Sequence, residues 1–380
     1  MSREPFLRLP RQGENLQGEW FLVKIAAGTY APPMKRPLFP EIPVPGIVLE
    51  PDQAHLDPLA GLLVAVIGYG TMGRAHVLNL RRSGVEVVVG ARGGSPRADL
   101  ARQEGADVRP VSEAVAAADL VMLLLPDEAM AESWRRDIEP HLRPGIPVGF
   151  AHGFAIAFDQ IRPGPARHCF LVAPKSQGDM LIEAHAAGGG VPGLLAATAG
   201  APLATWDLAA AYALAVGCLA GGGFVTTFRD ECISDQFGEQ VVLCGGVIEL
   251  LKAAFTVMVE GGYGEENAYF ECIHELKLIT DLLHRHGLDG MRGRISGTAA
   301  YGGLTRGPFL IDTSVRERMR QVLTEIEDGT FAREFLANHA DPDTGLAALK
   351  QREAAEPLIA AGRKVLPRLY PEEEDPEEGS

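Results

Sequence analysis

The stretch Val64-Ala-Val-Ile-Gly68-Tyr-Gly70-Thr-Met-Gly73-Arg-Ala-His76 decides the fold of the first part of this 380-residue chain. An apolar run of strand length leads into the spacing GxGxxG, and a helical pattern follows at once. In that context the glycines let the backbone approach a pyrophosphate, which the N–H groups of the helix N-terminus hold. The stretch therefore predicts a dinucleotide-binding βαβ unit. Its predicted cofactor-binding residues are Gly68, Tyr69, Gly70, Thr71, Met72 and Gly73.

Strand-like and helical segments alternate around this loop. Because continuous apolar strands joined by helical crossovers form parallel sheets covered on both faces, we expect an α/β, Rossmann-like, doubly wound parallel sheet. The predicted strands are residues 62–67, 85–89, 120–125, 148–150 and 169–172, and the predicted helices between them include residues 75–83, 95–104 and 112–118.

From about Thr227 the alternation stops and long helical segments follow, which predicts an all-α second domain. These segments are residues 235–261, 267–286, 314–328 and 331–338. The predicted domains are a proline-rich N-terminal extension (1–46), an NADPH-binding Rossmann-like domain (47–226), a helical metal and substrate domain (227–370) and an acidic, disordered tail (371–380).

The bulk composition narrows the classes of partner. A net charge of −15 argues against nucleic acid and anionic membranes, since both require basic surface. The five cysteines form no CxxC pair, and the first residues carry no apolar signal sequence, so we expect a cytoplasmic protein with reduced thiols. Residues 208–228 reach membrane-spanning length without a charge. Three glycines at 221–223 instead predict a buried helix, a turn and a buried strand.

The segment after the second predicted strand indicates which dinucleotide binds. An NAD enzyme usually presents an acidic residue there to hold the ribose hydroxyls. This chain reads Val88-Val-Gly90-Ala-Arg92-Gly-Gly-Ser95-Pro-Arg97, without a carboxylate. We therefore expect NADPH rather than NADH, with Arg92, Ser95 and Arg97 around the 2′-phosphate.

Acidic residues recur four apart in two helical segments, as Glu231, Asp235 and Glu239 and again as Glu271 and Glu275. Side chains at that spacing share one helix face, where like charges repel. An exposed polar face is the simpler reading, but the neighbouring residues are apolar, and buried carboxylates need a counter-charge. All-oxygen ligation favours Mg²⁺ over Zn²⁺ or Fe²⁺.

These motifs, in this order, resemble ketol-acid reductoisomerase of the short, class I form. The similarity extends over residues 51–369. The segments that carry it are residues 68–76, 124–128, 151–154, 172–175, 188–192, 235–240, 243–246, 269–277 and 295–296.

The resemblance implies a knotted helical domain and a homodimer, or higher homo-oligomer, with shared active sites. It implies that Asp235 and Glu239 bind Mg²⁺ together with Glu271 and Glu275 from the partner subunit. It also implies that Pro126, Asp127 and His152 lie at the cofactor. The implied catalytic set is His152, Lys175, Glu231, Asp235, Glu239, Glu271, Glu275 and Ser296.

The implied reaction is alkyl migration in a 2-hydroxy-2-alkyl-3-keto acid such as 2-acetolactate, followed by reduction by NADPH, in branched-chain amino-acid biosynthesis. Three departures flank the expected substrate pocket: Gly297 and Ala300 stand where the family usually has acids, and Ser-Gln follows Lys175. They keep three alternatives open. One is a paralogue acting on another keto or hydroxy acid, one a metal-independent β-hydroxyacid dehydrogenase, and one a non-catalytic NADPH-binding scaffold.

Overall fold

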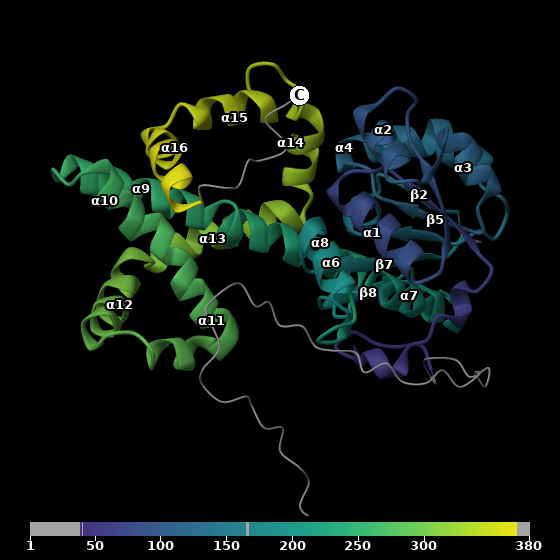
Figure 1. Cartoon of the computed structure of the whole chain (residues 1–380), viewed down its shortest axis with the longest axis horizontal. Helices are drawn as coiled ribbons and strands as arrows, with labels where there is room; N and C mark the ends of the chain where they lie inside the picture. Colours follow the sequence, from purple (N-terminus) through teal and green to yellow (C-terminus); the bar gives the residue numbers. More distant parts are fainter. Residues whose placement is uncertain (1–38, 40, 165–166, 371–380) are drawn as a thin grey trace, which may run out of the picture. The chain divides into compact units, whose positions relative to one another are not determined.

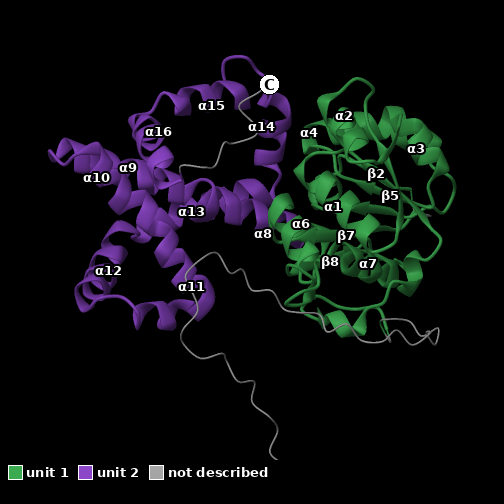
Figure 2. Cartoon of the chain, viewed as in Figure 1, with its two compact units in different colours: residues 1–229 green, residues 230–380 purple. Residues whose placement is uncertain are grey.

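The structure, a computed structural model, describes residues 39, 41–164 and 167–370. Most of the predicted extension 1–46, and all of the predicted tail 371–380, lie outside the described residues. The chain divides into two compact units, residues 1–229 and residues 230–380 (Figures 1 and 2).

Unit 1 is built on a sheet whose order, over the described residues, is β1-β9-β8-β7-β6-β5-β2-β3-β4. All five predicted strands are present, each within two residues of its expected bounds. Three further strands, β1, β4 and β8, were not expected, whereas β9 is the buried strand expected within residues 208–228. The bounds are β1 Val48–Leu49, β2 Leu63–Ile67, β3 Glu86–Gly90, β4 Asp107–Arg109, β5 Leu120–Leu123, β6 Val148–Phe150, β7 Cys169–Pro174, β8 Gly193–Ala197 and β9 Gly223–Val225.

The sheet is predominantly parallel, as expected for a Rossmann-like doubly wound fold, and two of its strand pairs are antiparallel. Strands β2 to β7 pair in parallel, whereas β8 pairs antiparallel with β7 and β1 pairs antiparallel with β9. Strand β8 reads Gly-Leu-Leu-Ala-Ala, without a β-branched or aromatic residue. Local sequence therefore gave no sign of the reversed strand.

Helices cover both faces of this sheet, as the prediction of a doubly wound fold requires. Along β2, Val64 and Val66 belong to one apolar cluster, and Ala65 and Ile67 belong to a second. Because successive side chains of a strand point to opposite faces, the two clusters are the two sides of the sheet. The helices of unit 1 are α1 Thr71–Arg82, α2 Pro96–Gln103, α3 Val111–Ala117, α4 Asp127–Ser133, α5 Phe154–Ala157, α6 Gly178–Ala186 and α7 Leu203–Val216.

The apolar stretch 208–228 folds as predicted. Helix α7 is buried over most of its length and ends at Gly217, whose φ of 81° is a left-handed cap. A glycine turn follows, with positive φ at Gly221 and Gly222, and leads into β9. The stretch is thus part of the core of unit 1.

Unit 2 is helical throughout its described residues, in agreement with the predicted all-α domain. The elements are α8 Phe228–Gly238, η5 Glu239–Leu243, α9 Gly246–Glu260, α10 Glu265–Tyr269, η6 Phe270–His274, α11 Glu275–Arg292, α12 Gly297–Leu310, α13 Thr313–Glu327, α14 Thr330–Asn338, α15 Leu346–Ala354 and α16 Pro357–Leu369. Both η5 and η6 are π-helical turns, which interrupt two helices that were expected to be continuous.

The buried apolar cluster of unit 2 is small. It joins Phe255 of α9 to Tyr269 of α10 and Val365 of α16, with two alanines between them. Ion pairs reinforce the same junction: Lys364 contacts Glu265 at 2.8 Å, and Lys252 contacts Glu353 at 2.7 Å. The helical stretch Phe228–Glu260 is also long and apolar enough to cross a membrane by length and composition alone.

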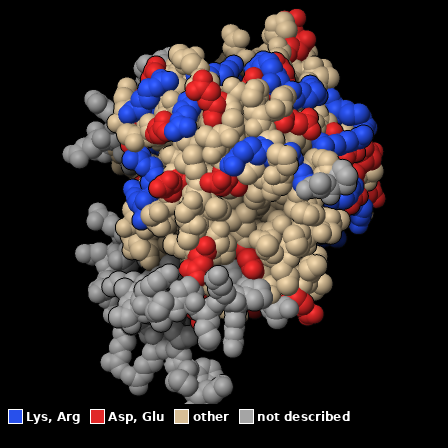
Figure 3. All heavy atoms as spheres, turned by 90° about the vertical axis from the view of Figure 1, so that its right-hand side faces the viewer, with Lys and Arg blue, Asp and Glu red and all other residues tan. Residues whose placement is uncertain are grey.

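The side of unit 1 seen in Figure 3 carries both signs of charge. Lysine and arginine side chains lie interspersed with aspartate and glutamate side chains over its upper part. Nucleic-acid-binding surfaces gather basic residues on one face. That face of the unit therefore has the mixed character of an ordinary protein surface.

A buried histidine gives unit 1 a predictable dependence on pH. The His76 ring is fully buried, with Nδ1 2.9 Å from the Tyr212 hydroxyl, and burial lowers its pKa from 6.5 to about 3. Below pH 6.5 the His76 ring therefore binds a proton in the unfolded chain, whereas in the folded chain it stays neutral down to about pH 3. Each pH unit in that window should cost up to about 1.4 kcal/mol of the free energy of unfolding.

We expect His76→Gln to flatten this part of the pH profile in urea unfolding between pH 7 and pH 4. His141→Gln, which removes an exposed histidine of the same unit, is the control and should leave the profile unchanged. Equal slopes in the wild type and in His76→Gln would contradict the assignment.

Candidate active site

The predicted site residues of unit 1 follow the carboxyl ends of parallel strands. Gly68 follows β2, Arg92 follows β3, Pro126 follows β5, His152 follows β6 and Lys175 follows β7. The carboxyl ends of parallel strands share one edge of a sheet. Chain order also reverses between β2 and β5, where open α/β sheets form their ligand crevice. The topology thus brings five predicted segments to the edge where a dinucleotide binds.

The three glycines of the loop have three different surroundings. Gly68 has a φ of +104°, and a Cβ there would lie 2.5 Å from the carbonyl oxygen of Leu124. A Cβ on Gly73 would overlap the carbonyl oxygen of Gly68. A Cβ on Gly70, by contrast, would meet no atom of the described chain within 4 Å. The protein itself thus requires glycine at 68 and 73, whereas the open side of Gly70 is left for a ligand.

Tyr69 contributes only its backbone to this loop. Its side chain is 2% exposed, and its hydroxyl donates a 2.6 Å hydrogen bond to Glu104. The ring of Tyr69, a predicted cofactor-binding residue, therefore points into the protein and not toward the ligand side. Residue type alone does not indicate this orientation.

The predicted 2′-phosphate segment is ordered by its serine. The Ser95 hydroxyl accepts from the N–H of Ala98 at 3.2 Å and donates to the carbonyl of Arg92 at 3.0 Å, so Ser95 caps α2. Arg92 and Arg97 are exposed on either side of that cap. Within the described ranges, neither guanidinium has an ion pair or a hydrogen bond.

His152 is oriented by Asp127. The Nδ1 atom of His152 lies 3.2 Å from the carboxylate of Asp127, the first residue of α4. A carboxylate can only accept, so Nδ1 carries the hydrogen and the lone pair of the neutral ring is on Nε2. Asp127, predicted at the cofactor, therefore has the local task of fixing the His152 tautomer.

Glycine also brings the segment after Lys175 against the nucleotide loop. A Cβ on Gly178, at the start of α6, would lie 2.5 Å from the carbonyl oxygen of Thr71. The start of α6 therefore packs on the first turn of α1. The backbone next to Lys175 and the backbone that binds pyrophosphate are held in one rigid contact.

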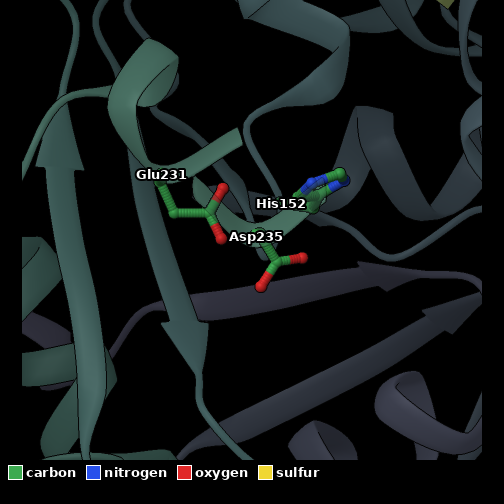
Figure 4. Close-up of side chains that lie close together, drawn as sticks. All are labelled: His152, Glu231 and Asp235. Atoms are coloured by element: carbon green, nitrogen blue, oxygen red, sulfur yellow. The ribbon is translucent and has the colours of Figure 1, made fainter. Parts of the chain in front are cut away.

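His152, Glu231 and Asp235 form a cluster of potential metal ligands. Each offers one ligand atom, and these atoms all lie within 4.8 Å of one another (Figure 4). Helix α8 carries both acids and starts at Phe228, whose ring packs edge-on against Phe150 at 5.8 Å. Phe150 ends β6, two residues before His152. This ring contact therefore helps to place Glu231, about one helical turn after Phe228, and Asp235, about two turns after it, near the histidine.

The chemistry of this cluster suits a hard cation. The Glu231 side chain is 1% exposed and Asp235 is half-buried, so two carboxylates share a site with little water. Carboxylate oxygens are the ligands that Mg²⁺ prefers. The two carboxylates therefore fit Mg²⁺, although of the four predicted metal ligands only Asp235 belongs to this cluster.

The other predicted site residues lie elsewhere on unit 2. Glu239 is the first residue of η5, Glu271 lies in η6 and Glu275 begins α11; all three are exposed in the single chain. The expectation that the acidic residues of both helical segments are buried is therefore wrong for Glu239, Glu271 and Glu275 in the isolated chain. Of the five acids, Glu231 is the buried one. Ser296 caps α12 by accepting from the N–H of Ala299 at 3.1 Å.

Both exposed acidic segments coincide with π-helical turns. Such turns are rare and occur frequently at functional sites. A third π-turn, Trp134–Ile138 in unit 1, holds no predicted site residue, so the turns at Glu239 and Glu271 do not by themselves mark a site. A π-turn has no signature in residue propensity, which is why the sequence predicted continuous helices.

Comparison with known proteins agrees with this geometry. The family model described as "Acetohydroxy acid isomeroreductase, NADPH-binding domain" matches residues 58–222, and the model described as "Ketol-acid reductoisomerase, C-terminal domain" matches residues 228–369. The chain belongs to the ketol-acid reductoisomerase family. It is accordingly an NAD(P)-dependent enzyme of the oxidoreductase and isomerase type.

Solved structures support the family assignment. An NADH-preferring ketol-acid reductoisomerase from an uncultured archean is 35% identical, with a TM-score of 0.81, over 84% of this chain and 98% of that one. A semialdehyde dehydrogenase NAD-binding protein from Cupriavidus necator, solved with calcium and NAD, is 18% identical, with a TM-score of 0.54, over 70% of this chain and 99% of that one. The second likeness concerns the fold alone.

The different surroundings of the loop glycines lead to a test in this ketol-acid reductoisomerase. Gly70→Ala should leave the melting temperature unchanged and weaken NADPH binding at least tenfold, because the methyl group enters the space of the pyrophosphate. Gly73→Ala should instead lower the melting temperature, because its Cβ overlaps the Gly68 carbonyl. Thermal unfolding and titration of NADPH fluorescence measure the two effects. Retained affinity in folded Gly70→Ala would contradict the assigned ligand side.

Proposed function

We propose that this enzyme is a Mg²⁺-dependent ketol-acid reductoisomerase acting on a 2-hydroxy-2-alkyl-3-keto acid such as 2-acetolactate. The alkyl group migrates to the neighbouring carbonyl carbon, and NADPH reduces the resulting 2-keto acid to a 2,3-dihydroxy acid, a step of branched-chain amino-acid biosynthesis. The observation that carries the proposal is the convergence of Glu231, Asp235 and His152 within 4.8 Å, in a chain with both domains of the family.

Asp235 and Glu239 would hold the metal together with two acids supplied by a partner subunit, Glu271 and Glu275. Glu231, which lies close to Asp235, would instead bind substrate or water. When bound, Mg²⁺ supplies Lewis acidity toward the keto and hydroxyl oxygens of the substrate. Two carboxylates this close together offer the oxygen ligands that a divalent cation such as Mg²⁺ prefers.

His152 has a defined part in this scheme. Because Asp127 fixes the hydrogen on Nδ1, the Nε2 lone pair is the atom that can accept a hydrogen from a water or a substrate hydroxyl. Lys175, one residue beyond β7 at the same edge, brings a positive charge to a site of anionic substrate and cofactor. We assign orientation to both residues, and we assign proton delivery during reduction to Glu239 or a water bound beside it.

NADPH is favoured by the segment between β3 and α2. No acidic residue occurs from Val87 to Ala98, so a ribose 2′-hydroxyl has no carboxylate to bind there. Arg92 and Arg97 offer two guanidinium groups at the capped start of α2, and such groups bind phosphate in bidentate fashion. The archaeal relative is described as NADH-preferring, so cofactor preference is a point on which the two proteins would differ.

A second copy of the chain is the proposed partner of unit 2. Large apolar side chains are exposed on several of its helices, among them Val257 (66%), Tyr301 (72%) and Phe309 (79%). Exposed apolar surface on this scale marks an interaction site. The stretch Phe228–Glu260, which is long and apolar enough to cross a membrane, includes Glu231 and Asp235 of α8 as well as α9. Because acidic side chains are costly inside a bilayer, we propose a protein partner rather than a membrane.

The start of α12 favours a second candidate, a ketol-acid reductoisomerase relative with another substrate. Its first turn, from Gly297, holds no acidic residue, and a Cβ on Gly297 would meet no described atom within 4 Å. Missing carboxylates and extra room next to Ser296 suit a larger or more anionic keto acid. Activity on bulkier analogues that exceeds the activity on 2-acetolactate would select this candidate.

The main proposal is tested by oxidation of NADPH in the presence of 2-acetolactate. We expect turnover with Mg²⁺, none in excess chelator, and slower turnover with NADH at equal concentration. Asp235→Asn should reduce kcat at least a hundredfold, because a neutral amide cannot offset the cation charge. Asp230→Asn, which changes an exposed acid of the same helix, is the matched control and should retain activity. Full turnover in chelator rejects the proposal.

The shared site is tested by mixing two inactive variants, Asp235→Asn and Glu271→Gln. If each site combines Asp235 of one chain with the partner subunit's Glu271, a mixed dimer contains one intact site and one doubly altered site. Co-expression at equal levels should therefore restore about a quarter of the wild-type activity, since about half of the dimers are mixed. A purified mixed dimer without activity would show that both residues serve the same chain's site, or none.

A further inference from the structure

A compact polar cluster joins α1 to the end of α2 on the cofactor side of unit 1. Its centre is the carboxylate of Glu104, the residue that follows α2. The Tyr69 hydroxyl donates to it at 2.6 Å, and the Arg74 guanidinium donates through Nη2 to Oε1 at 2.7 Å and through Nε to Oε2 at 3.1 Å. The backbone carbonyl of Glu104 also accepts from Arg81 at 3.0 Å. Two arginines of α1 therefore bind Glu104, the residue that directly follows α2.

The cluster is partly buried and its charges are matched. Burial alone would raise the pKa of the Glu104 carboxyl, but hydrogen bonds from Arg74 and Tyr69 hold it below its usual value. The geometry is the two-pronged guanidinium–carboxylate pair, which fixes orientation as well as distance. Tyr69, 2% exposed, cannot turn away without leaving its hydroxyl unsatisfied.

The elements joined by Glu104 bind different parts of the dinucleotide. Tyr69 is the second residue of the glycine loop, which approaches the pyrophosphate. The other end of α2 carries Ser95 with Arg92 and Arg97, the segment assigned to the adenosine ribose. Helix α2 has eight residues and is about 12 Å long. Because α2 is this short, movement of Glu104 at its C-terminal end displaces the ribose-binding end relative to the glycine loop.

We propose that Glu104 is a positioning residue that sets the distance between the pyrophosphate loop and the ribose-binding end of α2. This inference rests on the proposed dinucleotide site and adds a residue that touches no ligand. A ligand that spans both halves benefits from their fixed separation, because the cost of aligning them is met when the protein folds. A ligand that touches one half gains nothing from it.

The role of Glu104 can therefore be tested by comparing the Kd of the whole dinucleotide with the Kd of a fragment that touches one half. A purely structural role would not change the ratio of the two. In Glu104→Gln the charge of the pair is lost, so we expect the Kd of NADPH to rise at least tenfold. The Kd of the fragment adenosine 2′-monophosphate should change less than twofold. At saturating NADPH, kcat should stay within twofold of the wild type while the cofactor KM rises. NADH and adenosine 5′-monophosphate form a parallel pair, so the test does not depend on which cofactor is preferred.

Asp179→Asn is the matched control. Asp179 is the second carboxylate on Arg74, at 3.3 Å, and its side chain is 70% exposed, so its loss leaves the Glu104 contacts in place. We expect no change in either Kd. If Glu104→Gln does not fold, Tyr69→Phe removes only the phenol link to Glu104 and should separate the dinucleotide from the fragment in the same direction.

Equal losses for dinucleotide and fragment, or no loss in either variant, would overturn the inference. Binding is measured without substrate, so these outcomes are independent of turnover. A protein that shows the predicted binding but does not act on 2-acetolactate would contradict the proposed reaction and leave the role of Glu104 intact.

Discussion

Two carboxylates close together in a water-poor site are the constraint on which the proposed chemistry depends. Glu231 is almost fully buried and its ligand atom lies within 4.8 Å of that of Asp235. An ionised carboxylate loses several kcal/mol of hydration on burial, so it persists only beside compensating charge or donors. The surrounding structure is arranged to hold this pair: Phe228 packs on Phe150 and fixes where α8 begins, and His152 follows Phe150 by two residues.

The two units differ in how firmly their own packing holds the candidate site residues. Unit 1 supplies a rigid edge of parallel strands, on which backbone contacts such as Gly68 on Leu124 leave almost no freedom. Unit 2 supplies acids on helices that bury only a small apolar cluster of their own. A unit with so little core gains stability by covering its exposed apolar side chains.

Much of unit 1 could be predicted from the sequence because its signals are local. Strand β2, the glycine loop and α1 form one uninterrupted pattern, and helix α7 with its glycine turn was recognisable from residues 208–228. Strand β8 was missed because its residues have no strand preference, and its reversed direction depends on pairing with β7. The π-turns at Glu239 and Glu271 were missed because backbone hydrogen-bond register has no residue signature.

The candidate site was predictable in its members more than in its arrangement. Spacing placed Glu231 and Asp235 on one helix face, as observed, but apolar neighbours wrongly suggested that Glu271 and Glu275 are buried in the single chain. The approach of His152 to the two acids is a contact between residues about eighty apart, which only the fold creates. The inward turn of Tyr69 has the same origin, since its partner Glu104 lies 35 residues away.

The double hydrogen bonding of Ser95 bears on any redesign of cofactor preference. Its hydroxyl is already committed at both ends, to the Ala98 amide and to the Arg92 carbonyl. Replacing it would fray the helix start and alter both neighbouring arginines at once, confounding stability with selectivity. The two guanidinium groups, which project into solvent, are separable from that scaffold. Engineering toward the unphosphorylated dinucleotide should therefore spare the serine and begin with the arginines.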